Sequence, residues 1–393
     1  MTQYSIALCS RHFWPHVGPK CWWNMDFCRN LMRQGHRAMV FTQRANDQNP
    51  ACFNWNGAQV IRTFVKPWNP FAIGQSFLSS SRHLGQALAR CAAWPDCLLI
   101  NDTVRESMVA IQFALRHRIP AVVRIDHDWT TAPGWGKAAR QLKKLLRRQN
   151  VPIVFAANDP ATKSQLSEFQ DVELIEDGIS LDPPAFDLSR DRLERRAIFR
   201  ETHPILELQP NSRLALFVGP IPEGTQLVRL VQAWSQIRRD LPDSRFWISG
   251  NGRGEAEVWQ EIVQRELNNE VLMIGQFECL DDLIQIADLF VIPEVSIGQQ
   301  ALARRYVSFA ISRGIRVLCL DPHLRKQFGP SEPVSPGSES ESESLVTLIR
   351  NGLSDLISGG RDSSEQVESV IDFRQTVRAY EDLMSRLVGT NRG

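Results

Sequence analysis

The residues best suited to bind an anionic ligand lie in one segment, residues 291–320. Apolar residues 289–292 predict a buried strand, Pro293 begins a turn, and residues 299–312 predict a helix that ends at Gly314. The N–H groups at the start of a helix attract phosphate because they have no partners within the helix. We therefore expect an anionic ligand to bind at the turn after Pro293.

Charged side chains flank this turn. Glu294 is the acidic residue nearest to it, and Gly298 directly precedes the predicted helix. Four arginines in or just after the helix could neutralise a phosphate group, namely Arg304, Arg305, Arg313 and Arg316. Such arginines often form a solvated helix face instead, so both interpretations stay open.

Two glycine-containing loops supply further candidates. Lys20 follows Gly18 and could contact a phosphate, or it could be a solvated surface lysine. Pro19 lies between them and lacks the backbone N–H that would otherwise face an anion. Asn251 and Arg253 belong to a turn that could approach a nucleotide base or could simply join a strand to a helix.

The elements that must position these residues alternate between apolar strands and amphipathic helices, which is typical of parallel sheets. In the first half we expect strands at residues 5–9, 37–42, 59–63, 97–101, 121–125 and 153–157. In the second half we expect them at residues 213–218, 245–249, 271–274, 289–292 and 317–320. The predicted division is a domain at residues 1–187, a linker at 188–212, a domain at 213–365 and a C-terminal helix at 366–393.

Composition limits the possible functions. A chain of 393 residues with 43% hydrophobic content can form two cores, and its net charge of +1 gives no indication of nucleic-acid binding. No apolar run reaches the roughly 18–20 residues of a membrane span, and the N-terminus lacks a signal-peptide pattern, so we expect a cytoplasmic protein. The eight cysteines show no C-x-x-C pair and are expected to be reduced core thiols.

Short motifs also occur in order along the chain. They are Phe13-Trp-Pro-His-Val-Gly18, Leu31-Met-Arg-Gln-Gly-His36, His127-Asp128, Ile175-Glu-Asp-Gly-Ile-Ser180, Phe217-Val-Gly219, Ile248-Ser-Gly-Asn-Gly252, Val271-Leu-Met-Ile-Gly275, Ile286-Ala-Asp-Leu-Phe-Val-Ile-Pro293 and Asp372-Phe-Arg-Gln-Thr-Val-Arg-Ala-Tyr380. Each motif alone is weak. Together they resemble the motifs of GT-B glycosyltransferases of the family 4 type, the group similar to glycogen synthase.

The resemblance implies an α/β protein with two Rossmann-like domains whose parallel sheets face each other across a cleft. It implies transfer of a hexosyl group from a nucleotide-sugar, with retention and without a metal or cofactor, to a glycan, lipid or small-molecule acceptor. His127 and Asp128 would lie at the catalytic centre, where His127 would hydrogen-bond a sugar hydroxyl or be a loop histidine satisfied by its neighbours. The donor-side candidates are Gly18, Lys20, Gly219, Glu223, Asn251, Arg253, Glu294, Gly298, Arg304 and Arg305.

The chain departs from the family pattern at its charged donor contacts. Counting from Gly219, Pro220 stands where the family has an arginine, and Thr225 stands at about the position of its lysine. The family also has two glutamates eight residues apart. Counting from Pro293 places them at Ile297 and Arg305, and counting back from Gly314 places them at Ala301 and Phe309, so neither count finds a carboxylate.

Two hypotheses follow. The first is an active glycosyltransferase, and the second is a catalytically inactive glycosyltransferase-like protein that serves as partner or scaffold for another glycosyltransferase. A basic helix predicted near residues 136–148 could contact the inner face of a membrane or be an ordinary exposed helix. Residues 338–344, a Ser-Glu repeat, are expected to be a flexible loop.

Overall fold

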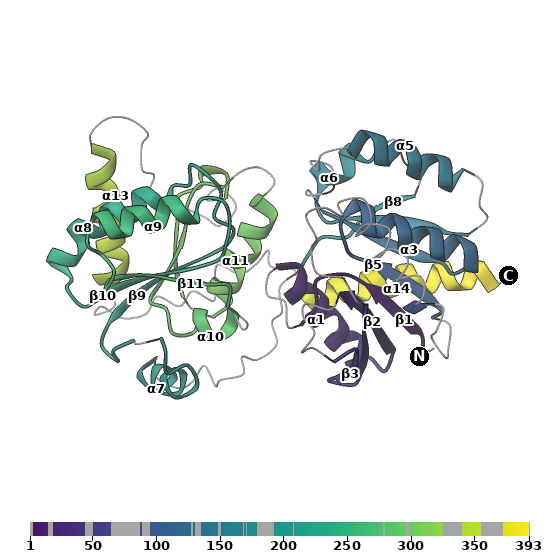
Figure 1. Ribbon diagram of the computed structural model, residues 1–393, viewed down its shortest axis with the longest axis horizontal. Coiled ribbons are helices and arrows are strands. Elements are labelled where there is room, and N and C mark those ends of the chain that lie inside the picture. Colours follow the sequence, from purple (N-terminus) through teal and green to yellow (C-terminus); the bar gives the residue numbers. More distant parts are fainter. Residues whose placement is uncertain are drawn as a thin grey trace, which may run out of the picture. The chain divides into compact units, whose positions relative to one another are not determined.

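The structure is a computed structural model of the chain (Figure 1). It describes residues 3–14, 19–43, 50–63, 87–88, 95–126, 129, 135–147, 151–167, 169, 171–178, 192–206, 208–277, 280–295, 299–313, 315–324, 340–354 and 372–392. The chain forms two compact units. Unit 1 consists of residues 1–178 and 371–393, and unit 2 consists of residues 179–370.

Unit 1 contains an eight-stranded sheet in the order β3-β4-β2-β1-β5-β6-β7-β8. The strands are β1 (Ser5–Cys9), β2 (Arg37–Gln43), β3 (Cys52–Trp55), β4 (Ala58–Thr63), β5 (Cys97–Ile100), β6 (Ala121–Ile125), β7 (Ile153–Ala157) and β8 (Val172–Leu174). Neighbouring strands are parallel except β3 and β4, which form an antiparallel pair. The helices are α1 (Pro19–Arg33), α3 (Val104–His117), α5 (Trp135–Leu146), α6 (Pro160–Gln165) and α14 (Phe373–Arg392).

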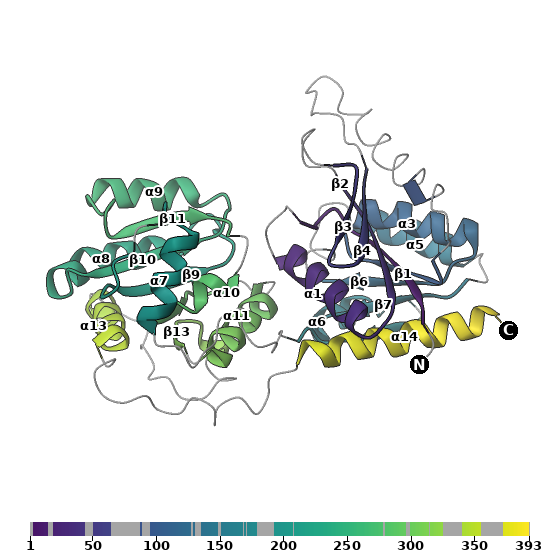
Figure 2. The same cartoon turned by 90° about the horizontal axis from the view of Figure 1, so that it is seen from below.

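Helices cover both faces of this sheet, as Figures 1 and 2 show. In β1, Ile6 and Leu8 pack into the core formed with α1 and α14, whereas Ala7 and Cys9 face the core formed with α3 and α5. This alternation follows from the two-residue period of side chains along a strand. Because both faces are buried, the central strands β1, β5 and β6 are apolar except for Ser5 and the buried Arg124, which is why the sequence predicts them well.

Unit 2 contains a five-stranded sheet in the order β11-β10-β9-β12-β13, in which all adjacent strands are parallel. The strands are β9 (Arg213–Val218), β10 (Ser244–Ser249), β11 (Val271–Gly275), β12 (Leu289–Ile292) and β13 (Arg316–Cys319). The helices are α7 (Arg192–Thr202), α8 (Leu227–Asp240), α9 (Glu255–Gln264), α10 (Leu280–Ile284), α11 (Gln300–Ser312) and α13 (Ser340–Ser354). Residues of α8, α9 and α13 form one core with this sheet.

The expected fold class, two α/β units with parallel sheets, is confirmed. Strands β3 and β8 are absent from the prediction, because they are short strands at the two edges of their sheet and are not apolar throughout. Helix α7 occupies much of the expected linker at residues 188–212.

One smaller expectation was wrong, and a second was wrong for a single cysteine. Residues 340–344 begin α13 and do not form a loop, and serine and glutamate are residues that favour a helix N-terminus. Of the six cysteines that the structure describes, Cys9, Cys21, Cys28, Cys97 and Cys319 are buried, but Cys52 is exposed because it lies on the edge strand β3.

Candidate functional site

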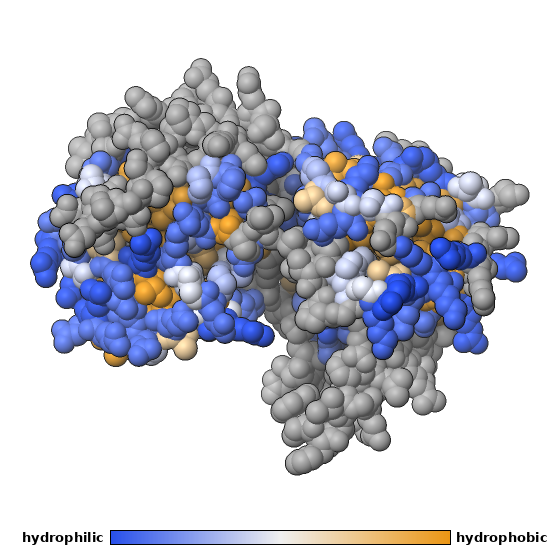
Figure 3. Space-filling model, turned by 90° about the horizontal axis from the view of Figure 1, so that it is seen from above, coloured by the Kyte–Doolittle hydropathy of each residue, from blue (hydrophilic) through white to orange (hydrophobic). Residues whose placement is uncertain are grey.

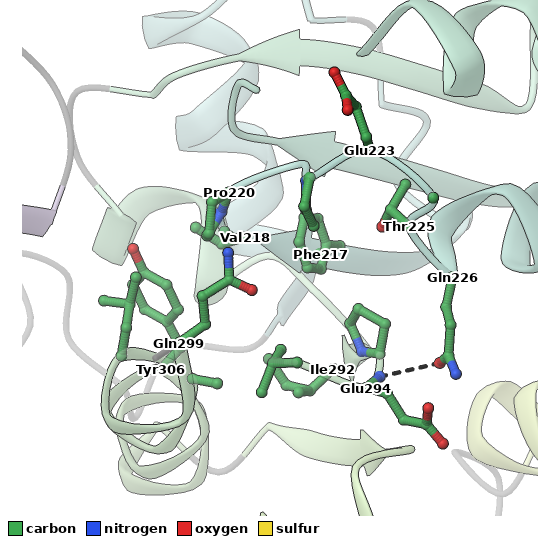
Figure 4. A pocket seen from close by; sticks show the side chains of 17 residues that line it. Phe217, Val218, Pro220, Glu223, Thr225, Gln226, Ile292, Glu294, Gln299 and Tyr306 are labelled. Atoms are coloured by element: carbon green, nitrogen blue, oxygen red, sulfur yellow. Dashed lines mark hydrogen bonds between the residues drawn. The ribbon is translucent and has the colours of Figure 1, made fainter. Parts of the chain in front are cut away.

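A pocket of about 400 Å³ lies in unit 2 at the carboxyl ends of β9 and β12. The loop from Gly219 to Gln226, which joins β9 to α8, forms one wall, and the turn after β12 forms another. The start of α11 closes a further side through Gln299, Leu302, Ala303 and Tyr306 (Figure 4). Ligands of parallel sheets bind at this end of the strands, beside helix N-termini. The pocket lies beside the turn after Pro293, where the sequence predicts that an anionic ligand binds.

The wall from Gly219 to Gln226 rests on a second loop that contains three glycines. A Cβ atom on Gly250 would lie 1.8 Å from the Gly219 carbonyl oxygen, and one on Gly252 would lie 2.1 Å from the Ile221 carbonyl oxygen. Gly254 makes an equally close approach to the carbonyl oxygen of Pro222. Only a residue without a side chain fits at these positions. The three glycines therefore determine where the pocket wall lies.

Two polar side chains connect the loops around the pocket. The side-chain oxygen of Gln226 accepts a hydrogen bond from the backbone N–H of Glu294 at 3.0 Å, which links the wall to the turn after β12 (Figure 4). Asp321 is buried after β13 and accepts hydrogen bonds from the N–H groups of Val295, His323 and Leu324. Neither Gln226 nor Asp321 is among the site residues predicted from the sequence. Asp321 could have been found, because it directly follows a predicted strand on the ligand-binding edge.

The lining of the pocket mixes apolar and polar side chains and contains no lysine or arginine among the residues that the structure describes there. Glu223 and Glu294 are exposed at its rim. Burial raises the pKa of the Tyr306 phenol. The nearby positive charge of Arg305 offsets only part of this rise, so the phenol is neutral near pH 7. The groups offered to a ligand are therefore hydroxyls, amides and two carboxylates, with apolar side chains between them.

The other predicted donor-side residues of unit 2 lie apart from this lining. Asn251 and Arg253 are exposed in the glycine-containing loop behind the wall, so they form the strand-to-helix turn. Residues 299, 302, 303 and 306 share one face of α11, and Arg304 and Arg305 lie off that face. Gly298 lies outside the described residues.

Arg313 and Arg316, the other two arginines predicted as phosphate contacts, have partners elsewhere in unit 2. The guanidinium group of Arg313 lies 4.8 Å from the centre of the Phe309 ring. The Arg316 guanidinium lies 3.5 Å from the carbonyl oxygen of Gly352 on α13. Contacts within unit 2 therefore explain the positions of both side chains without a phosphate.

Unit 1 has a buried polar network at the carboxyl edge of its own sheet. Arg124, 5% exposed, donates hydrogen bonds to Asn101 and Asp177 and lies 4.7 Å from the centre of the Trp23 ring. Burial lowers the pKa of Arg124, but Asp177 and other nearby groups outweigh this effect and raise it, so Arg124 is charged. The Lys20 ammonium group lies 3.0 Å from Asp126. This pairing explains the position of Lys20 without a phosphate.

Three predicted residues of unit 1 cannot be placed. Gly18, His127 and Asp128 lie outside the described residues, although Asp126, which directly precedes His127, belongs to the network around Lys20. In the part of the chain that the structure describes, no group of three or more His, Cys, Asp or Glu side chains is arranged to hold a metal ion.

Helix α5 matches the basic helix expected near residues 136–148. Its apolar side chains, including buried Leu142, pack into the core of unit 1, and Lys137, Arg140 and Lys144 are exposed. Hydrophilic side chains cover much of the described surface on the face drawn in Figure 3. None of the helices described here is both long enough and apolar enough to cross a membrane.

Two α/β units with mainly parallel sheets are the architecture of GT-B proteins. The fold is similar to that of sucrose-phosphate synthase from Thermosynechococcus elongatus, with a TM-score of 0.66, 16% identity and coverage of 99% of this chain and 100% of the other. It is also similar to the fold of a glycosyltransferase from Rickettsia africae, with a TM-score of 0.62, 14% identity and coverage of 99% of each chain. A third similar structure is Anabaena HepE in complex with UDP and glucose, with a TM-score of 0.64, 15% identity and coverage of 98% of this chain and 100% of the other.

Family models identify the chain more closely. The model of the glycosyl transferase 4-like domain matches residues 24–197, and that of glycosyl transferases group 1 matches residues 198–298. Among curated protein sequences, none matches the chain. The chain belongs to the GT-B glycosyltransferases of the family 4 type.

Proposed function

We propose that this glycosyltransferase transfers a hexosyl group from a nucleotide-sugar to a glycan, lipid or small-molecule acceptor. The observation that carries the proposal is the pocket at the carboxyl ends of β9 and β12, beside the start of α11. The structure of Anabaena HepE, which has a similar fold, contains UDP and glucose. In our proposal this pocket of unit 2 receives the donor, and the carboxyl edge of unit 1 receives the acceptor.

We propose further that the reaction retains the configuration of the anomeric carbon and needs no metal ion. The protein would then act by positioning the donor and by hydrogen-bonding the leaving group, as preorganised sites do. His127 and Asp128 remain the candidates for the catalytic centre. Activity should persist in EDTA, and the anomer of the product, followed by NMR, should match that of the donor. An inverted product or loss of activity in EDTA would contradict this part of the proposal.

Calorimetry with UDP, GDP and ADP and their common sugar conjugates tests donor binding directly. We expect one base to bind with a micromolar dissociation constant. Gln299→Ala should weaken that binding about fivefold, because it removes one hydrogen-bonding side chain of the pocket, worth about 1 kcal/mol. The matched control is Gln264→Ala, an exposed position at the end of α9, which should bind like the unmodified protein. Equal losses in both variants would argue against this pocket.

The inactive partner or scaffold remains the second candidate function. The observation that favours it is the absence of a lysine or arginine from the described lining of the pocket. It predicts that none of the nucleotides or nucleotide-sugars binds and that no sugar is transferred. Binding of one donor together with transfer to any acceptor would exclude it.

We also propose that the exposed basic face of α5 contacts anionic lipid head groups. The residues 135–147 contain no acidic side chain, and each lysine or arginine near an anionic membrane contributes about 1 kcal/mol. The protein should sediment with vesicles that contain anionic lipid and should dissociate in high salt. Lys137→Gln/Arg140→Gln/Lys144→Gln should abolish this, whereas Lys163→Gln on α6 should not. Equal binding to neutral vesicles would contradict the proposal.

A further inference from the structure

The wall of the pocket in unit 2 has few backbone N–H groups to offer a phosphate. The amides of Gly219 and Ile221 donate to the carbonyl oxygens of Ser249 and Asn251, at 3.0 and 2.9 Å. The amide of Gly224 donates to the side chain of Glu257 at 3.0 Å. Positions 220 and 222 are prolines, which have no N–H group. A loop that binds phosphate keeps such groups directed at its ligand.

The charges around the pocket also disfavour a diphosphate. The described lining has no lysine or arginine, and the carboxylates of Glu223 and Glu294 stand at its rim. The N-terminus of α11 attracts anions, but a helix terminus carries only about half an elementary charge. The exposed carboxylates of Glu223 and Glu294 add negative charge near this terminus.

The remaining groups of the lining suit an uncharged ligand that carries hydroxyls. Thr225 and Gln299 offer a hydroxyl and an amide group, and Leu302, Ile292 and the ring of Tyr306 provide apolar surface. Gln226 spans from the wall to the N–H of Glu294. A volume of about 400 Å³ is within the range of pockets that hold small organic ligands.

We propose that this pocket recognises the nucleoside of the donor, and that the diphosphate contributes little to its affinity. The inference rests on the proposed nucleotide-sugar function and deepens it by assigning the affinity to the uncharged part of the donor. It follows from the two prolines, the three amides that donate elsewhere and the lack of a cation among the described lining residues, because together they leave few of the contacts that a diphosphate needs.

The test is calorimetry with uridine, guanosine and adenosine, each compared with its mono- and diphosphate, at two salt concentrations. For the base that binds, we expect the nucleoside and its diphosphate to have affinities within about threefold of each other, with little dependence on salt. A diphosphate that binds ten times or more tightly than its nucleoside would overturn the inference and would leave the proposed function standing.

A gain-of-function variant sharpens the test. Pro220→Arg/Thr225→Lys places cations at the two family positions and should raise the affinity for the diphosphate at least tenfold over the nucleoside, in a salt-dependent manner. The control Pro220→Gln/Thr225→Gln adds length without charge and should leave the ratio unchanged. An unchanged ratio in the charged variant would place the diphosphate away from this wall and overturn the inference.

The two proposals fail in different ways. If a nucleoside binds as expected but no sugar conjugate of that nucleoside supports transfer, the proposed function fails, and of the inference only the binding of a nucleoside without help from the diphosphate stands. If no nucleoside or nucleotide binds to the unmodified protein, the inference fails together with the nucleotide-sugar donor.

Discussion

Replacing Arg196 by methionine should lower the free energy of unfolding by about 3–5 kcal/mol. The guanidinium group is fully buried and donates to Asp288, which is fully buried as well, at 2.7 Å. It also donates to the carbonyl oxygens of Ile286, Pro210 and Ser212. Methionine fills a similar volume but leaves a buried carboxylate without its cation, and several carbonyl groups without a donor. Urea unfolding measures the change.

Two further variants show whether charge causes the loss. Arg200→Met changes an exposed position of the same helix and should stay within about 0.5 kcal/mol of the unmodified protein. Arg196→Met/Asp288→Asn removes both charges, and its amide oxygen can still accept the hydrogen bond that Asp288 receives from the Leu214 N–H. This double variant should recover part of the loss. A loss below about 1 kcal/mol in Arg196→Met would contradict the argument.

Gly250→Ala should reduce ligand binding at least tenfold and should destabilise the protein by about 1–3 kcal/mol, the usual result of forcing extra atoms into a packed site. The added Cβ would lie 1.8 Å from the Gly219 carbonyl oxygen, so the backbone of the pocket wall must move. Gly219 and its neighbours line the pocket, and the movement therefore changes the site itself. Calorimetry with the ligand that binds, together with urea unfolding, measures both effects.

The control for this substitution is Gly136→Ala in the first turn of α5, where no atom lies within 4 Å of the added Cβ. Alanine has a higher helix propensity than glycine, so this variant should be more stable by about 0.5–1 kcal/mol. Its ligand affinity should not change. If Gly250→Ala binds as tightly as Gly136→Ala, the glycine-containing loop does not determine the shape of the pocket.

The comparison of sequence and structure shows which strands an apolar pattern can find. The strands β1, β6 and β9 are buried along nearly their whole length, and their predicted bounds agree with the structure. The strands β3 and β8 lie at the edges of their sheet, where residues are partly exposed, so no apolar run marks them. The same reasoning explains α7, whose many charged residues resemble a linker although Arg196 is buried at 0% exposure.

The residues that line the candidate site were harder to predict from the sequence than the strands. The motifs pointed to the turn after Pro293 and to the loop after β9, and both segments line the pocket because both follow strands of one sheet edge. It could not decide whether Arg304 and Arg305 line the pocket, because that depends on the rotation of α11 about its axis. Gln226 carries no charge and belongs to no motif, so its hydrogen bond to the Glu294 N–H could only be found in three dimensions.

The sequence by itself determined the class of fold, because burial on both faces leaves a local pattern in the chain, and it predicted the sheet edge of unit 2 at which the pocket lies. Counting from Gly219 along the family motif also predicts that Pro220 and Thr225 stand at about the positions of a positively charged pair of the family. The tertiary structure alone decided that Gly250, Gly252 and Gly254 support the pocket wall and that Lys20 pairs with Asp126. These contacts join residues distant in the chain, and no local pattern encodes such a distance.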